Sequence, residues 1–172
     1  MFKRCIATML LAGTAFAFTA APAGATLTGV SLNGGGFIDD QTTGGPNDKA
    51  SVAAHLPCPG AATADVQNAG IVARFGRAGA FRLQTLTESE CTLNDPNGDI
   101  AGGVLEGTGT GTCNGEAANV TFGFGDSVDV RGLGVIDAVD LQIDGSAPGC
   151  RLLSLSGVLE GGNLVLRTAA AQ

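Results

Sequence analysis

Hydrophobic and polar residues alternate with a period of two over most of the chain. From Phe81 to Leu93 the odd positions are apolar or small, while the even positions include Arg82 and Glu90. The same alternation recurs on the even positions of 120–124 and on the odd positions of 139–143. Such a pattern is typical of a β-strand with one buried face and one face in water. We therefore expect the odd positions from 81 to 93 to point inward.

Turn sequences separate these alternating segments at short intervals. Asn114-Gly115, Asp144-Gly145 and Gly161-Gly162 are examples, and glycine supplies the positive φ that hairpin turns need. The pattern predicts an all-β fold, an antiparallel β-sandwich or partly open barrel of about eight strands. The approximate strand segments are 34–38, 50–56, 70–76, 80–92, 102–112, 119–126, 139–144, 151–159 and 163–167.

The first 25 residues differ in character from the rest. Lys3 and Arg4 precede an apolar run, and Ala23-Gly24-Ala25 has the small-residue form of a cleavage site. This order predicts a cleaved secretory signal. We expect a secreted protein with a single domain at 26–172, with loose ends at 26–33 and 168–172.

Four cysteines remain after the signal, and in an exported chain an even number favours two disulfides. Successive hairpins reverse the chain direction, which places Cys58 and Cys91 at one end of the strands and Cys113 and Cys150 at the other. Cysteines at opposite strand ends are too far apart for a disulfide. The hairpin order therefore predicts the pairs Cys58–Cys91 and Cys113–Cys150.

Composition and charge restrict the class of partner. The chain has 172 residues, of which 44% are hydrophobic and 15% charged, and its formal net charge is −7. The predicted signal contains two of the nine basic residues and none of the 16 acidic ones, so the exported part is more acidic still. Such a surface repels phosphate groups. We expect no nucleic-acid partner and no membrane insertion.

Several segments resemble the post-COAP type of domain found in secreted bacterial proteins. The resemblance rests on the turn 107–115, the strand 120–126, the strand 139–143 and the closing segment 155–166, and it covers 34–166. It implies a small, exported, all-β module without an established activity, and it supplies no catalytic residues. The four cysteines and the missing tyrosines depart from the family pattern.

The chemistry-bearing residues favour no enzyme. His55 is the only histidine, and a structural or surface role fits it better than nucleophilic catalysis. The chain lacks Trp and Tyr, the usual platforms for a sugar ring. We expect no catalytic residues and no cofactor.

An acidic segment after the 119–126 strand provides candidate calcium ligands, Asp126, Asp129 and Asp137. Calcium takes six to eight oxygen ligands, but the segment has no EF-hand spacing, so a solvated acidic loop is the favoured interpretation.

The resulting hypothesis is a non-enzymatic structural or interaction module at the bacterial cell exterior, with an unknown protein or cell-surface partner. Two alternatives stay open. One is a secreted enzyme or enzyme inhibitor that acts through the loops 57–69 and 126–138, and the other is a calcium-stabilised adhesin-like domain.

Overall fold

The computed structural model describes residues 29–39, 49–59, 67–75, 79–93, 102–130 and 134–168. The predicted signal 1–25 and most of the predicted loop 57–69 lie outside these ranges. Within the described ranges, no helix is long and apolar enough to cross a bilayer.

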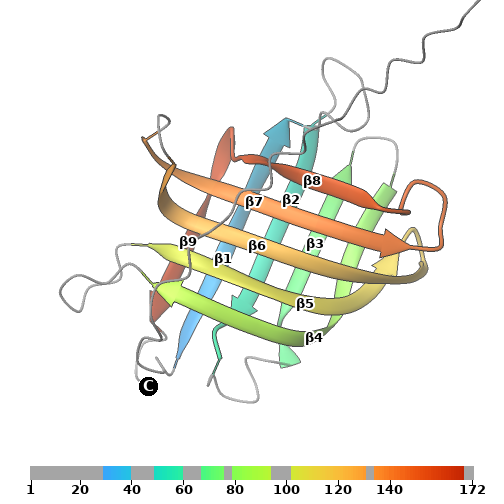
Figure 1. Ribbon diagram of the computed structural model, residues 1–172, viewed down its shortest axis with the longest axis horizontal. Helices are drawn as coiled ribbons and strands as arrows, with labels where there is room; N and C mark the ends of the chain where they lie inside the picture. Colours follow the sequence, from blue (N-terminus) through green and yellow to red (C-terminus); the bar gives the residue numbers. More distant parts are fainter. Residues whose placement is uncertain are drawn as a thin grey trace, which may run out of the picture.

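Nine antiparallel strands form one sheet, which confirms the predicted all-β class (Figure 1). The strands are β1 (Val30–Asp39), β2 (Lys49–Pro57), β3 (Gly70–Phe75), β4 (Gly79–Leu93), β5 (Gly103–Cys113), β6 (Glu116–Val130), β7 (Gly134–Gly145), β8 (Leu153–Val158) and β9 (Gly161–Thr168). β1 to β8 are neighbours in chain order, and β9 returns to pair with β1. The sheet therefore has β8 at one edge and β9 at the other.

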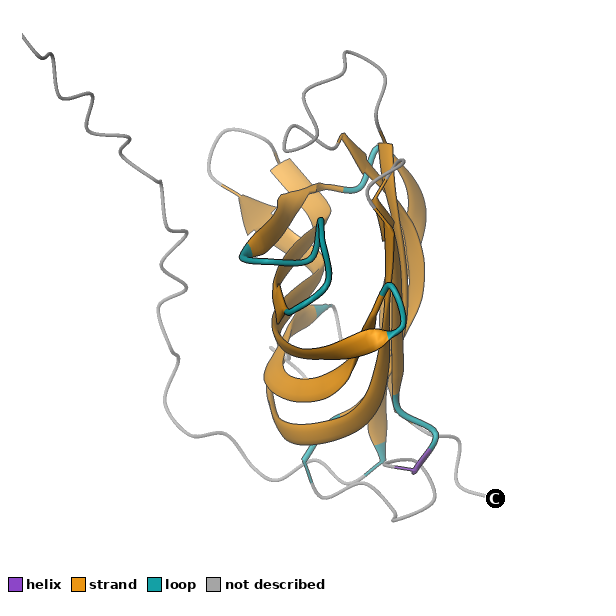
Figure 2. Ribbon diagram, turned by 90° about the vertical axis from the view of Figure 1, so that its right-hand side faces the viewer, coloured by secondary structure: helices purple, strands orange, loops and turns teal. Residues whose placement is uncertain are grey.

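The sheet curls into a half-barrel, so that its two halves face each other (Figure 2). In Figure 1, strands β4 to β8 cross in front of β9, β1, β2 and β3. Three phenylalanines, Phe75, Phe81 and Phe124, are fully buried in the core. One continuous sheet can thus enclose a core because it folds over on itself.

β4 and β5 lie where the sheet turns from one layer to the other. β4 shifts register against β5 between Leu83 and Thr85 and again between Leu86 and Glu88, and such bulges bend a strand. On β5, glycines on the inner face leave room for the curve. A Cβ at Gly109 would lie 2.5 Å from the Cδ1 atom of Leu83. A side chain at Gly109 would therefore collide with the bent strand β4.

The predicted alternation is correct for β6 and β7 and wrong for the middle of β4. On β6 and β7 the predicted inward residues Val120, Phe122, Phe124, Val139, Leu141 and Ile143 are all buried. On β4, Thr85 and Thr87 were expected to point inward but are exposed, and Leu86 packs against the core instead. The two register shifts cause this change, because each shift reverses the face that the next residue occupies.

Both predicted disulfides are confirmed. Cys58 pairs with Cys91 at a Cα–Cα distance of 5.5 Å, and Cys113 pairs with Cys150 at 6.0 Å. The first links the end of β2 to β4, and the second links the end of β5 to the turn before β8. The pairing could be derived because every strand from β1 to β8 lies beside the next one in sequence.

Three segments differ from the sequence expectations. β1 begins at Val30, so 30–33 is not a loose end. Val30 and Leu32 are buried, and β1 pairs with both β2 and β9. At the other end β9 extends to Thr168, which pairs with Val30.

The third difference concerns the predicted acidic loop 126–138, which is mostly strand. β6 continues to Val130 and β7 begins at Gly134, with Val128 opposite Ile136. A register shift after Gly125 lets this pairing continue, and local acidic composition gave no sign of that shift.

Candidate functional site

Two of the candidate calcium ligands bind the backbone of β9. The Asp126 carboxylate on β6 accepts a hydrogen bond from the Leu166 amide at 2.6 Å, and the Asp137 carboxylate on β7 accepts one from the Leu164 amide at 2.8 Å. Asp126 is the buried charged residue of the described core, and Asp137 is half-buried. These carboxylates therefore tie the outer edge of β9 to β6 and β7.

The third candidate, Asp129, lies in β6, but its side chain is outside the described part of the structure. Among the described side chains, no group of three or more His, Cys, Asp or Glu residues is placed to hold a metal ion. What the structure shows for Asp126 and Asp137 is a structural role toward β9.

His55 lies half-buried on β2, in a short hydrogen-bonded chain with β1. Its Nδ1 atom is bonded to the Asn33 Oδ1 atom, and the Asn33 amide donates to the Ser31 hydroxyl at 2.9 Å. In a nucleophilic site the serine hydroxyl contacts the imidazole directly. Here Asn33 separates the two, so the arrangement positions a surface histidine and supplies no activated serine.

Two depressions lie side by side on the outer face of strands β5 to β8, and both include Thr121 and Gln142. The larger, of about 440 Å³, is lined by Asn119, Val120, Thr121, Gln142, Ile143, Asp144, Leu152, Leu153 and Ser154. The smaller, of about 300 Å³, is lined by Glu106, Gly107, Thr108, Thr121, Phe122, Gly123, Asp140 and Gln142. We call the two together the outer groove.

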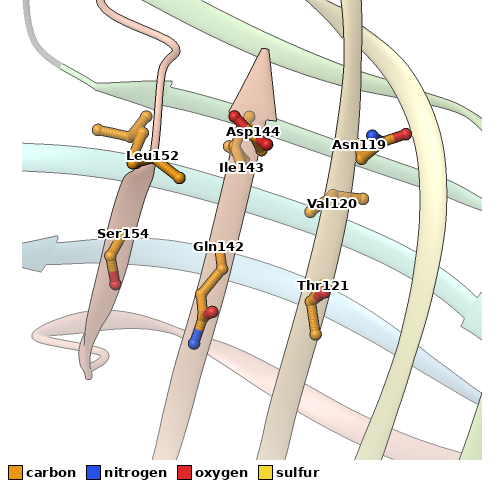
Figure 3. A pocket seen from close by; sticks show the side chains of 9 residues that line it. Asn119, Val120, Thr121, Gln142, Ile143, Asp144, Leu152 and Ser154 are labelled. Atoms are coloured by element: carbon orange, nitrogen blue, oxygen red, sulfur yellow. The ribbon is translucent and has the colours of Figure 1, made fainter.

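The side chains of the outer groove stand in cross-strand rows. Thr121 lies opposite Gln142, and Gln142 lies opposite Ser154. Figure 3 shows these three side by side on β6, β7 and β8, with Asn119, Asp144 and Leu152 in the next row. Because neighbouring strands are about 4.8 Å apart, the rows present hydrogen-bonding groups at a regular spacing.

The smaller depression contains a notch between two carboxylates. Gly123 lies between Glu106 on β5 and Asp140 on β7. A Cβ at Gly123 would be 3.9 Å from the Glu106 Oε1 atom and 3.9 Å from the Asp140 Cβ atom. Burial raises the pKa of Asp140 above its usual value, although a hydrogen bond with Gln142 acts in the opposite direction. The Asp140 carboxylate is thus partly removed from water and keeps one side-chain partner, Gln142.

The outer groove was not predicted from the sequence. The polar positions between the buried residues of β6 and β7 indicate only one face of a strand in water. Which of them become neighbours depends on the register between strands, for example Thr108 opposite Thr121. The alternation of threonine with glycine along β5 was the available signal, since it indicates one face free of side chains and one face that is polar.

No family model, no curated protein and no solved structure matches this chain. The resemblance to post-COAP domains stays a prediction from the residues that carry it.

Proposed function

We propose that this protein is an exported, non-enzymatic interaction module and that its binding surface is the outer groove. The observation that carries the proposal is the continuity of two depressions across four neighbouring strands. Their linings combine amide, hydroxyl and carboxylate groups with the exposed Leu152. Polar groups of this kind fix the orientation of a partner, and the exposed leucine offers it an apolar contact.

The geometry favours an extended partner over a small enclosed molecule. The outer groove is formed by outward-facing side chains of a single sheet face, so it has a floor but no opposite wall. Small-molecule sites normally bury most of the ligand surface. A partner that lies along the sheet can contact both depressions at once.

Two further observations support export and a place at the cell exterior. The two disulfides indicate an oxidising environment, of the kind found outside the cytoplasm. The order of basic, apolar and small residues in 1–25 is that of a secretory signal. The resemblance to post-COAP domains is consistent with this proposal.

The proposal can be tested by binding of the labelled protein to the cells that produce it. Thr121 is exposed and belongs to both depressions, so Thr121→Arg should fill their junction and weaken saturable binding at least tenfold. Ala53→Arg is the matched control, because Ala53 is exposed on β2, in the other layer. Equal binding by Thr121→Arg and the unsubstituted protein, or no saturable binding at all, would contradict the proposal.

A further inference from the structure

The register of β8 determines which of its backbone groups point out of the sheet. The Leu159 amide donates to the Asp137 carbonyl at 2.9 Å, in the register that pairs Leu155 with Leu141. In an antiparallel ladder, residues with backbone bonds to the partner strand alternate with residues that have none. The backbone N–H and C=O groups of Leu155 and Leu159 point toward β7. Those of Ser154 and Ser156, which alternate with them, therefore point to the open edge.

The described part of the structure contains no hydrogen bond to these outward groups of Ser154 and Ser156. Proteins commonly protect an edge strand with a charged residue, a proline or a bulge. β8, with the sequence Leu-Ser-Leu-Ser-Gly-Val, has no charged residue and no proline, and its pairing with β7 shows no register shift. The edge is thus able to accept another strand.

The open edge continues directly into the outer groove. Ser154 belongs to the larger depression, and Leu152, just before β8, is 78% exposed. Leu152 also has a φ of 52°, which is costly for a leucine and turns the chain just before β8. A strand added to β8 would therefore have an apolar contact at one end and the polar rows of the outer groove along its side.

Charge selects the kind of strand that fits. β5, β6, β7 and β8 contain no lysine and no arginine, whereas Glu106, Asp140 and Asp144 line the outer groove. Ser156 lies opposite Asp140, and its small side chain leaves a path from the edge to that carboxylate. A lysine or arginine on the added strand is long enough to cross one serine position.

We propose that β8 pairs with an extended, basic peptide segment of another protein, which adds a tenth strand to the sheet and directs lysine or arginine side chains toward Asp140 and Asp144. Main-chain bonds provide affinity in this mode of recognition, and side chains provide specificity. The inference rests on the proposed function, because it names the partner of the outer groove.

A second copy of this chain fits the edge less well. Two β8 strands paired about a two-fold axis would bring two acidic outer faces into one continuous surface, on a chain with a net charge of −7. Like charges at such short separation oppose association.

The test uses the disulfide-bonded protein and a synthetic peptide, acetyl-Thr-Val-Lys-Val-Thr-Val-Lys-amide, followed by ¹⁵N NMR. We expect saturable binding, with the largest shifts at the amides of Ser154 and Ser156. The same peptide with glutamate in place of lysine should bind at least tenfold more weakly. A lysine peptide methylated on alternate backbone nitrogens, on the set that faces β8, should lose binding.

A pair of variants separates backbone pairing from side-chain contact. Ser156→Pro removes one outward N–H and no bond to β7, so it should weaken peptide binding at least tenfold while the thermal unfolding midpoint changes little. Ser156→Ala keeps the N–H and should bind within about threefold of the original protein. An unchanged affinity in Ser156→Pro would overturn the inference.

The remaining outcomes are also decisive. Peptide shifts confined to Thr121 and Gln142, without shifts at the edge amides, would overturn strand addition and leave the proposed function standing. Self-association through the Ser154 and Ser156 amides, seen by analytical ultracentrifugation and NMR, would replace the peptide with a second copy. No binding of the lysine peptide would overturn the inference, whereas the cell-binding experiment with Thr121→Arg judges the proposed function separately.

Discussion

The two edges of the sheet differ in the hydrogen bonding of their outward backbone amides. At the β9 edge, Asp126 and Asp137 accept the outward amides of Leu166 and Leu164. At the β8 edge, the described structure provides no such acceptor, and serines occupy the outward positions. Antiparallel pairing alone does not close a sheet, because each edge strand leaves every second residue without a partner. In this molecule side chains from β6 and β7 supply the missing acceptors on one side only.

The comparison extends to the aspartates themselves. Asp126 is buried, and a backbone amide compensates its carboxylate for the lost water. Asp140 lies on the outer face near the open edge, and burial raises its pKa. The hydrogen bond with Gln142 offsets only part of this desolvation, so the Asp140 carboxylate is better placed to receive a cation from a partner.

The largest expected effect comes from removing the disulfide on the β8 side. Replacing Cys113 and Cys150 together by alanine should lower the free energy of unfolding by about 3 kcal/mol. Without the bridge, the unfolded chain regains the conformational entropy that the closed loop removed. Chemical denaturation measures the loss. Since this bridge holds the turn before β8, hydrogen exchange at Leu155 should also rise.

The pair Cys58 and Cys91 provides the control for that experiment. Its removal should cost a similar amount of stability, since its sequence separation is 33 against 37, but it should not open β8 locally. An equal rate of hydrogen exchange at the Leu155 amide in both double variants would show that the edges do not differ in local stability.

The second prediction concerns the carboxylate that closes the β9 edge. Asp126→Ala should lower the free energy of unfolding by about 2 kcal/mol, because the Leu166 amide loses its acceptor in a buried position. Asp126→Asn keeps an oxygen and should cost roughly half as much. Urea denaturation of the three proteins checks the order, and an equal loss in both variants would contradict the role of the acceptor.

A third prediction compares the edges directly by hydrogen exchange. The Leu164 and Leu166 amides are bonded to carboxylates, so they should exchange at least about tenfold more slowly than the amides of Ser154 and Ser156. In Asp126→Ala, the Leu166 amide alone should approach the rate of the serines. Similar exchange rates of the β8 and β9 edge amides in the original protein would show that the carboxylates do not protect the β9 edge.

The smallest effect is the pH dependence of Asp140. Its folded-state pKa is raised, so the folded protein holds this proton more tightly than the unfolded chain. Stability from this group therefore decreases as pH rises through the interval above the ordinary value of 3.8. Asp140→Asn should stabilise the protein at neutral pH by well under about 1 kcal/mol, because the side chain is partly solvated, and the gain should vanish below that interval. Thermal unfolding at several pH values measures it.

Much of the fold was predictable because it is local in sequence. Alternation identified the buried residues of β6 and β7, and hairpin order was enough to pair Cys58 with Cys91 and Cys113 with Cys150. These features depend only on neighbouring strands. The bulges of β4 escaped prediction because the glycines that permit them lie on β5, so neither strand shows the bend by itself.

The roles of the acidic residues could not be predicted in the same way. Asp126 and Asp137 meet amides of β9, whose outward direction is set by its pairing with β1. That pairing joins distant parts of the sequence and leaves no local pattern. The outer groove was missed for a related reason, since its rows depend on the register of four strands.

The pairing of β1 with β9 also imposes an order of events on folding. β1 to β8 can form one hairpin after another as the chain is synthesised, since each strand lies beside its predecessor. The other edge of β1 stays unpaired until β9 has formed. Pairs such as Val30 with Thr168 form only when nearly the whole sequence is present. Until then the glycine-rich edge of β1 is exposed to other chains. A chain truncated before β9 should therefore aggregate through β1, and completion of synthesis should act as the step that makes the protein soluble.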